Sequence, residues 1–347
     1  MLPLAVLLLV VAPSAALEPG PEPPSFELWA AEHRPDGYGS AEEAQLRAGI
    51  FAAEAARVRA HNARAARGLE TYTQAVNGWS DLTTAEWKAA VGLGTVLQPA
   101  ALNVTHLPEL PDGAPQSLDW RAKGAVTPVK NQGGCGGCWS FGATGTMEGA
   151  WQIAGHKLVS LSEQQLISCS GQGCSGGNPG HAIQYVAHNH GIDSERDYKY
   201  TAKNGKCDAE KAGHYVAAFK GVGSVPQQNE RQLLAAVSRQ PVAVAIDAEH
   251  GGFRSYHRGV MGGKCGTKID HSVLIVGFGT ELVPPPPTPG PTVSCAAPTS
   301  FLGCFVVNRT ALVLPKVAGR DHDRLTLENC AQQCQGMKLA VAGVDVR

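Results

Sequence analysis

The sequence predicts an α+β protein in which a helix-rich first part is followed by a strand-rich second part. Between residues 17 and about 110, one set of positions recurs at three- and four-residue spacing, which lines one face of a helix; its members are Leu46, Ile50, Ala53, Arg57 and Val58. The next zone, to residue 280, begins with helical patterning and contains many glycines. It ends in two apolar stretches typical of strands, PVAVAID and HSVLIVGFG.

Length, charge and composition narrow the class of protein. The chain has 347 residues, enough for two or three domains at about 100–200 residues each. Its 29 basic and 30 acidic residues give a net charge of -1 without a long run of either sign, so we expect no nucleic-acid partner. An apolar content of 43% and 41 glycines are typical of a globular protein with many turns.

The N-terminal segment predicts export. Residues 1–16 form an apolar run that is too short to span a bilayer and contains the small residues Ser14 and Ala16 near its end, as signal peptidase requires. An uncleaved anchor is the alternative, because no Lys or Arg precedes the run. Export fits the ten cysteines, which mostly form disulfides in an oxidising compartment. In that compartment Asn103 and Asn308, each in an Asn-x-Thr triplet, become candidates for glycosylation.

The chemistry of the chain is concentrated in NQGGCGGCWSFG, residues 131–142. Cys138 opens an apolar stretch with helical spacing, so its sulfur is expected at a helix N-terminus, where the helix dipole favours a thiolate. A thiolate nucleophile also needs a base and a donor for the oxyanion that forms on the attacked carbonyl. Gln132, on the preceding glycine-rich loop, is the candidate donor, and His271, at a strand start, is the candidate base.

These motifs resemble those of the papain family of cysteine proteases, over residues 26 to about 280. DWRAKGAVTPVKNQG resembles the start of a mature enzyme, Gln132 matches the oxyanion glutamine, Cys138 the nucleophile, and His271 the base, although Gly137 stands where Ser or Ala is usual. The resemblance implies a two-lobed fold in residues 114–280, with a helical left lobe and a β-barrel right lobe. It also implies an endopeptidase that cleaves peptides or proteins without a cofactor or metal, in an extracellular or a lysosomal or vacuolar setting.

The same resemblance implies how substrate is bound. Gly176 and Gly177 match glycines whose backbone hydrogen-bonds an extended substrate, with a simple turn as the alternative. Five residues match the pocket for the substrate residue two before the scissile bond, and these are Asn178, Pro179, Ala245, Ile269 and Ser272. Four of the five are small or apolar, which favours an aliphatic or aromatic substrate side chain.

The resemblance further implies two disulfides, Cys135–Cys174 and Cys169–Cys207. Cys135-x-x-Cys138 is also the spacing of a redox pair or of half a zinc site, but the chain lacks a second paired-cysteine motif. The pairing of the other five cysteines stays open, and these are Cys265, Cys295, Cys304, Cys330 and Cys334.

Residues 17–113 resemble the inhibitory pro-region of the cathepsin L-like branch. The interspersed signature appears as Glu43, Arg47, Ile50, Phe51, Val58 and Asn62, with Glu54 where Asn is usual. The motif that follows appears as Asn77-Gly-Trp79-Ser-Asp81, with Ala75 for Gly and Trp79 for Phe. The resemblance implies a zymogen whose pro-segment occupies the cleft and is removed at acid pH by cleavage near residues 108–114.

The C-terminal part departs from the family pattern. After His271 no Asn-Ser-Trp-Gly motif follows, so the asparagine that orients the histidine and several strands are missing, and we expect a sheet with open edges. Residues 281–300 read as a Pro-rich linker. Residues 301–347 resemble part of a WSC domain, a carbohydrate-binding module, with an apple-type module as the alternative.

Two functional hypotheses follow from the sequence. One is a secreted cysteine endopeptidase made as a zymogen. The other is a catalytically inactive homologue, or a truncated gene model, that acts at most as a protease- or carbohydrate-binding protein. The intact nucleophile and base favour the first hypothesis, and the missing asparagine and strands favour the second.

Overall fold

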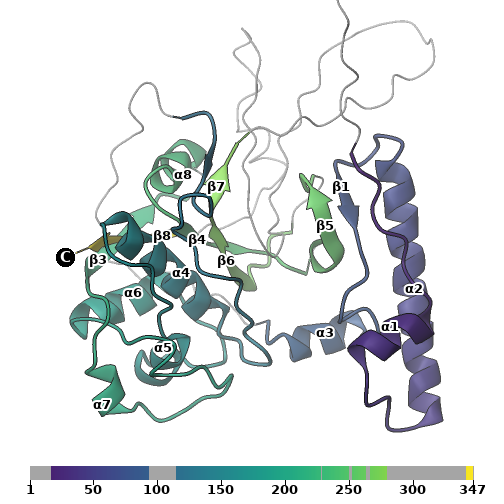
Figure 1. Cartoon of the computed structure of the whole chain (residues 1–347), viewed down its shortest axis with the longest axis horizontal. Coiled ribbons are helices and arrows are strands. Elements are labelled where there is room, and N and C mark those ends of the chain that lie inside the picture. The colour runs from purple at the N-terminus through teal and green to yellow at the C-terminus, as the bar shows by residue number, and fades with distance from the viewer. Residues whose placement is uncertain are drawn as a thin grey trace, which may run out of the picture.

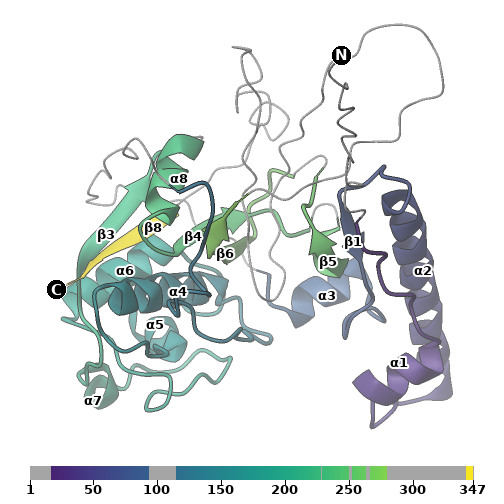
Figure 2. The same cartoon turned by 45° about the horizontal axis from the view of Figure 1, so that its top comes forward.

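A computed structural model describes residues 17–93, 115–227, 229–249, 252–262 and 266–279, together with the backbone of 341–346. Several predicted features lie outside these residues: the signal peptide 1–16, Asn103, the cleavage region 108–114, the linker 281–300, Asn308 and most of the C-terminal module. None of the described helices is long and apolar enough to cross a membrane. The described residues form two parts, and α3 lies between them (Figures 1 and 2).

The N-terminal part contains α1 (Phe26–His33), α2 (Ala41–Ala65), β1 (Tyr72–Gln74) and α3 (Thr84–Ala90). Each helix begins after a hydroxyl side chain that accepts a hydrogen bond from the first turn, and these caps are Ser25, Ser40 and Thr83. Thr83 and Glu86 form a reciprocal capping box. The predicted helix is confirmed, and α2 extends as far as Ala65.

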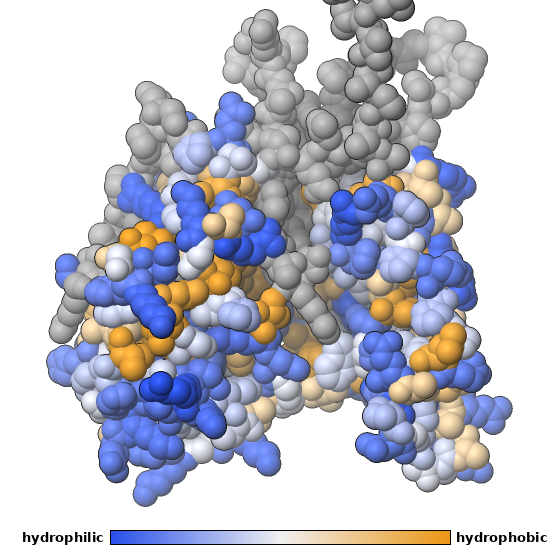
Figure 3. Space-filling model, in the orientation of Figure 1, coloured by the Kyte–Doolittle hydropathy of each residue, from blue (hydrophilic) through white to orange (hydrophobic). Residues whose placement is uncertain are grey.

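The buried face of α2 differs from the predicted one. Phe51, Ala55, Val58 and His61 are buried, whereas Leu46 is 58% exposed and Ala53 is exposed. Phe51 and Ala55 pack against Trp29 of α1, and this contact selects their side of the helix. Leu46 instead lines a shallow hollow on the outer face with Gly49, Ile50 and Ala53. Figure 3 shows apolar patches set among polar surface on both parts of the molecule.

The second part begins with β2 (Leu118–Asp119) and a helical lobe. Its helices are α4 (Cys138–Ile153), α5 (Glu163–Cys169), α6 (Pro179–His188) and α7 (Ala209–Ala212). In its core, Trp139 and Met147 of α4 pack with Leu166, Ile183 and Phe219, and all five side chains are essentially inaccessible to solvent. Both predicted disulfides, Cys135–Cys174 and Cys169–Cys207, are confirmed.

A sheet lobe follows. Its elements are β3 (Phe219–Val225), α8 (Glu230–Val237), β4 (Val242–Ile246), the 3-10 turn η1 (Phe253–Ser255), β5 (Tyr256–Gly259), β6 (His271–Ile275), β7 (Gly277–Phe278) and β8 (Val341–Val346). The two predicted strand stretches become β4 and then β6 with β7. Strands β4 and β6 pair antiparallel, with Ile246 opposite His271 and Ala245 opposite Ser272. The predicted order is therefore confirmed for the two lobes, because the helical lobe precedes the sheet lobe, although β2 comes before the first and α8 lies within the second.

Strand β8 corrects one expectation drawn from the C-terminal sequence. The four-stranded sheet has the order β3-β8-β4-β6, so β8 lies between β3 and β4 and pairs with both. Residues 341–346 were expected in a separate module and the sheet was expected to lack a strand here. Backbone pairing explains the difference, because β3 and β4 both present unpaired N–H and C=O groups that an extended segment satisfies.

Candidate active site

Cys138 is the first residue of α4, as the sequence predicts, and its side chain is buried. Gly137 precedes it without a capping side chain, so the first-turn N–H groups stay available near the sulfur. Burial raises the pKa of the Cys138 thiol to about 11, although backbone N–H groups of Ser272 and Trp139 oppose this shift. Ser272 directly follows His271, so α4 and β6 meet at the sulfur.

His271 opens β6 on the opposite side of the site. Burial lowers the pKa of its imidazole to about 4, and its Nδ1 atom meets no hydrogen-bond partner among the described residues. The ring of Phe253 lies edge-on to it, with ring centroids 6.1 Å apart. Both shifts have the same cause, the removal of each side chain from water.

The side-chain amide of Gln132 has both of its N–H groups engaged. Nε2 donates to the Cys135 carbonyl at 3.0 Å and to the Val91 carbonyl at 2.8 Å. The Cys135 contact holds the amide on its own loop. The Val91 contact comes from the segment after α3, so an N-terminal residue occupies one donor of the amide that the sequence marks as the candidate oxyanion donor.

The segment that reaches Gln132 fits because residue 92 is glycine. Gly92 has a φ of +59°, and a Cβ there would lie 2.6 Å from the Cys135 carbonyl carbon and 2.7 Å from the Gly136 nitrogen. Any side chain would therefore push this segment away from the loop. The sequence analysis missed this contact, since a glycine after a helix equally marks an ordinary helix end.

The two predicted substrate-binding glycines lie beside the nucleophile's loop. Gly176 has a φ of +100° and donates its N–H to the Gly136 carbonyl at 3.2 Å. A Cβ at Gly177 would lie 2.7 Å from the Trp139 ring. Gly176 therefore needs glycine for its backbone conformation and Gly177 for packing, and the structure places both next to the segment that ends in Cys138.

The five predicted pocket residues divide into two groups. Ala245 and Ile269 form one apolar cluster with Cys138. Pro179 and Ser272 both lie near Gly142 of α4, where a Cβ would be 3.6 Å from Pro179 Cγ and 2.6 Å from Ser272 Oγ. Asn178 instead caps α6, because its side-chain oxygen accepts hydrogen bonds from the Gly180 and His181 N–H groups.

Two family descriptions match the chain, and they divide it as the fold does. Residues 114–285 match the papain family cysteine proteases, and residues 26–87 match the cathepsin propeptide inhibitor domain. Vignain of Ricinus communis is 39% identical over 266 residues, which cover 74% of this chain and 72% of the relative. The chain belongs to the papain family of cysteine proteases.

Further papain-family relatives and solved structures support this assignment. Oryzain beta chain of Oryza sativa subsp. japonica is 41% identical over 74% of this chain and 56% of the relative. The chain thus spans between about half and three quarters of the length of curated relatives that it matches. The structure of a recombinant stem bromelain precursor superimposes with a TM-score of 0.73 at 29% identity, over 93% of this chain and 98% of that one. A digestive procathepsin L 3 of Tenebrio molitor gives a TM-score of 0.63 at 34% identity, over 74% and 83%.

The pro-region of this papain-family chain is docked on the sheet lobe through backbone pairing. Strands β1 and β5 pair antiparallel, with Tyr72 opposite Gly259 and Gln74 opposite Tyr256. At the same surface Arg254 donates to the carbonyls of Trp79 and Leu82, the latter at 2.9 Å. The pro-region is therefore fixed at β5 and at Gln132, two places far apart in the sequence.

Side chains in and next to the two predicted pro-region motifs take part in this docking. Arg57 donates to Ser255 Oγ at 2.9 Å, and Ser255 Oγ also bonds Glu54. Asn77 Nδ2 donates to the Arg254 carbonyl at 2.7 Å. Glu54, which stands where Asn is usual, thus contributes a carboxylate to the interface.

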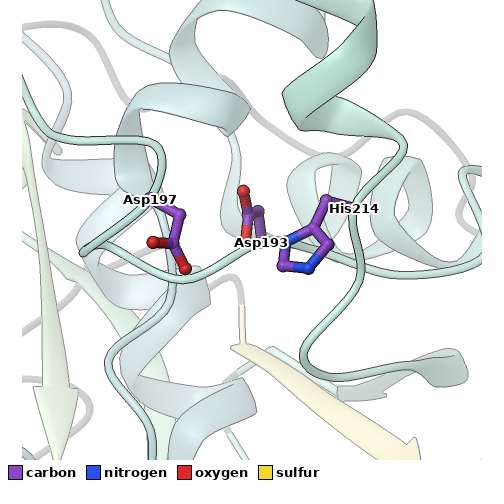
Figure 4. Close-up of side chains that lie close together, drawn as sticks. All are labelled: Asp193, Asp197 and His214. Atoms are coloured by element: carbon purple, nitrogen blue, oxygen red, sulfur yellow. Dashed lines mark hydrogen bonds and ion pairs between the residues drawn. The ribbon is translucent and has the colours of Figure 1, made fainter.

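One further group of side chains lies close enough to share a metal ion. Atoms of Asp193, Asp197 and His214 lie within 4.8 Å of one another (Figure 4). The protein already engages them, because His214 Nδ1 lies 2.8 Å from Asp193 Oδ1 and Arg196 pairs with Asp197. Asp193 also accepts from the Ser194 N–H at 2.7 Å. These contacts give the cluster a structural role, because they link residues 193–197 to His214.

Proposed function

We propose that this chain is the precursor of a cysteine endopeptidase. The observation that carries the proposal is that two elements meet at one sulfur: Cys138 opens α4, and the backbone of Ser272, directly after His271 at the start of β6, lies against its thiol. Gln132 lies on the loop that leads into α4 and bonds the Cys135 carbonyl there. A thiol at a helix N-terminus beside an imidazole is the arrangement that nucleophilic attack on a carbonyl requires. The family membership supports the same reaction class.

The reaction proceeds in two halves once the pro-region has left. His271 takes the proton of Cys138, and the thiolate attacks the peptide carbonyl carbon while the carbonyl oxygen gains negative charge. The Gln132 amide and the Cys138 N–H stabilise that oxyanion. His271 then gives its proton to the leaving amine, and a water molecule, deprotonated by His271, hydrolyses the resulting thioester.

The precursor is held inactive by the pro-region. The Val91 carbonyl occupies the Gln132 N–H that the oxyanion needs, and β1 is paired with β5. Substrate and pro-segment therefore compete for one donor. Cleavage near residues 108–114 at acid pH separates the two parts.

The substrate is an extended peptide or protein segment. Backbone groups of Gly176 and Gly177 bind it beside Cys138, and Ala245, Ile269, Pro179 and Ser272 favour an aliphatic or aromatic side chain two residues before the scissile bond. The apolar cluster of Cys138 with Ala245 and Ile269 supports this preference. Asn178 contributes through the cap of α6 that places Pro179.

The cellular setting belongs to the same proposal. Residues 1–16 direct the chain into the secretory pathway, Asn103 and Asn308 carry glycans, and the enzyme acts outside the cell or in a lysosome or vacuole. Carbohydrate binds the C-terminal module, predicted over residues 301–347. The two disulfides support an oxidising route.

A catalytically inactive, protease- or carbohydrate-binding homologue is the second candidate. One observation favours it: His271 Nδ1 meets no hydrogen-bond partner among the described residues. Without an orienting group, the imidazole forms the ion pair less readily.

Hydrolysis of a peptide amide by the acid-treated chain tests the proposal. We expect activity that Cys138→Ala abolishes and that Gln132→Ala lowers roughly 10²- to 10³-fold, the usual effect of losing one oxyanion donor. Labelling with an epoxide inhibitor selective for papain-like thiolates should occur on Cys138 alone. Soluble, folded protein that neither hydrolyses the peptide nor takes up the label would favour the inactive homologue.

A further inference from the structure

We propose that Tyr200 is a positioning residue for the oxyanion donor, and that its hydroxyl fixes the backbone of Gln132. The Tyr200 Oη atom donates to the Gln132 backbone carbonyl at 2.7 Å, across 68 residues of sequence. This inference rests on the proposed protease function. It assigns a role to a side chain that neither binds substrate nor contacts the scissile bond.

Tyr200 joins the loop of the donor to the helix of the nucleophile. Its ring meets Phe141 edge-on, with ring centroids 5.0 Å apart. Phe141 lies in the first turn of α4, three residues after Cys138. One tyrosine therefore contacts both the residue that offers the oxyanion donor and the helix turn that carries the attacking sulfur, so it fixes the distance between them.

The loop from Asn131 to Gly137 is anchored differently at its two ends. The later end is held by the Cys135–Cys174 disulfide and by the Gly136 N–H, which donates to the Cys174 carbonyl at 2.9 Å. At the earlier end, the Tyr200 hydroxyl donates to the Gln132 carbonyl, and this is the hydrogen bond which that carbonyl accepts among the described residues. Removing the Tyr200 hydroxyl therefore loosens the Gln132 backbone, while Lys130, two residues earlier, stays paired with Glu148 and Glu163.

Tyr200 is itself held firmly. Its N–H donates to Glu195 Oε1 at 2.8 Å, and the next residue, Thr201, donates to Gln164 Oε1 at 2.9 Å. Burial, followed by the charges of Glu163, Cys138 and Glu195, raises the pKa of the Tyr200 hydroxyl well above its ordinary value. The hydroxyl consequently stays protonated and remains a donor at every pH at which the enzyme works.

The position of Gln132 matters because its amide has a single donor to offer. One N–H is bound to the Cys135 carbonyl, which leaves the other for the oxyanion. In the precursor the Val91 carbonyl accepts the hydrogen bond from this second N–H. A displacement of about 1 Å from the productive geometry is enough to lower a rate substantially. Tyr200 prevents that displacement.

Tyr200→Phe tests the inference, because it removes one oxygen and keeps the ring on Phe141. In the acid-activated full chain we expect kcat for a peptide amide to fall roughly tenfold, with KM changed less than about twofold, since the lost contact acts in the transition state. Alkylation of Cys138 by iodoacetamide forms no oxyanion, so its rate should stay within about twofold of wild type. Tyr215→Phe, at an exposed tyrosine before β3, is the matched control and should change neither rate.

A double-mutant cycle with Gln132→Ala shows through which residue Tyr200 acts. If Tyr200 positions the Gln132 amide, Tyr200→Phe should lower kcat less than about twofold in the Gln132→Ala background. An unchanged kcat in Tyr200→Phe, a matching fall in alkylation, or an equal tenfold loss in both backgrounds would overturn the inference. Wild-type chain that is alkylated at Cys138 but hydrolyses no peptide would instead overturn the proposed function, and this inference with it.

Discussion

The pro-region and the catalytic region of this chain are stabilised in different ways. Residues 17–93 have a small apolar core around Trp29 and Phe51 and depend on capped helices and ion pairs at the surface. Residues 115–279 have two larger cores and two disulfides. The difference means that the pro-region depends on its contacts with the catalytic region, whereas the catalytic region has internal supports of its own.

The carboxyl groups of the two regions also differ in the direction of their pKa shifts. In the pro-region, N–H and hydroxyl contacts from Thr83, then Arg47, lower the pKa of Glu86 to about 2. The pKa of Glu54 is lowered as well, because hydrogen bonds from Arg57 and Ser255 outweigh burial. In the catalytic region, burial raises the pKa of Asp270 to about 6 and also raises that of Glu163, Glu195 and Glu230. Asp119 and Asp197, paired with arginines near the surface, shift downward instead.

These directions imply opposite responses to pH. A carboxyl with a lowered pKa stabilises the folded state above its ordinary pKa, and this contribution is lost as the pH falls through the lowered value. A carboxyl with a raised pKa destabilises the folded state as the pH rises from its ordinary pKa through the raised value. Acid therefore weakens the pro-region through Glu86 and Glu54. In the catalytic region acid relieves the buried carboxyls, but protonation of His271 and of the lowered carboxyls Asp119, Asp197 and Glu249 opposes that relief.

The largest expected effect removes an internal support of the catalytic region. Replacing Cys169 and Cys207 by Ser opens a disulfide that spans 38 residues, which should lower the free energy of unfolding of the catalytic region by about 3–4 kcal/mol. Urea unfolding in the Cys138→Ala background measures this. Hydrogen exchange within α2 should change far less. An equal loss of protection in both regions would contradict the separate stabilisation of the two regions.

The next effect loosens the pro-region at the active site. Gly92→Ala meets both a φ of +59° and backbone atoms within 3 Å, so we expect the pro-segment contact to weaken by about 2–3 kcal/mol. The precursor should then hydrolyse a small peptide at neutral pH faster than the unmodified chain. Gly37→Ala is the matched control, because Gly37 has a φ of +71° with no atom near its Cβ position. Equal activation by both variants would mean that φ strain, and not the close approach, is responsible.

A smaller effect is expected at the other docking surface. Arg254→Ala removes the donors to the Trp79 and Leu82 carbonyls and the cation above the Trp87 ring, so the pro-region should dissociate more easily by about 2 kcal/mol. The rate of pro-region release from the cleaved Cys138→Ala protein measures this. Arg196→Ala, at an exposed ion pair, should leave the rate unchanged.

The smallest effect is the pH response itself. Between pH 7 and pH 4, the opening free energy of the pro-region should fall by about 1 kcal/mol, a modest value because Glu86 is 40% exposed and solvent screens its ion pair. His61 adds to the fall, because burial lowers the pKa of its imidazole and folding is weakened as the pH drops below its ordinary value. Hydrogen exchange of Cys138→Ala at the two pH values measures both regions. Glu54→Gln and His61→Gln should each flatten the response of the pro-region, and an unchanged pH response in both variants would refute the roles of these two groups.

Local patterns in the sequence predicted much of the fold and of the site. Cys138 at a helix start, His271 at a strand start and the two disulfides all lie where the sequence and its family resemblance placed them. Each of these depends on short stretches whose chemistry is visible along the chain. The buried side of α2 was predicted less well, because the position of Trp29 decides it and periodicity alone does not.

Contacts between distant segments could not be predicted in this way. The residues next to Val91 and Tyr200 in the sequence do not indicate that both contact Gln132. Val91 does so through its carbonyl and Tyr200 through its hydroxyl. The placement of β8 between β3 and β4 is of the same kind. Such contacts follow from the assembled topology, which sequence spacing does not report.

The place of β8 in the sheet has a consequence for how the chain folds. Its two neighbours, β3 and β4, are separated from it by a long stretch of sequence, so closing that stretch must precede their pairing. Until β8 arrives, β3 and β4 face each other with unpaired edges that can capture strands of other molecules. We therefore expect slow refolding whose yield falls as protein concentration rises, and rescue by a synthetic peptide of residues 341–346 supplied in excess.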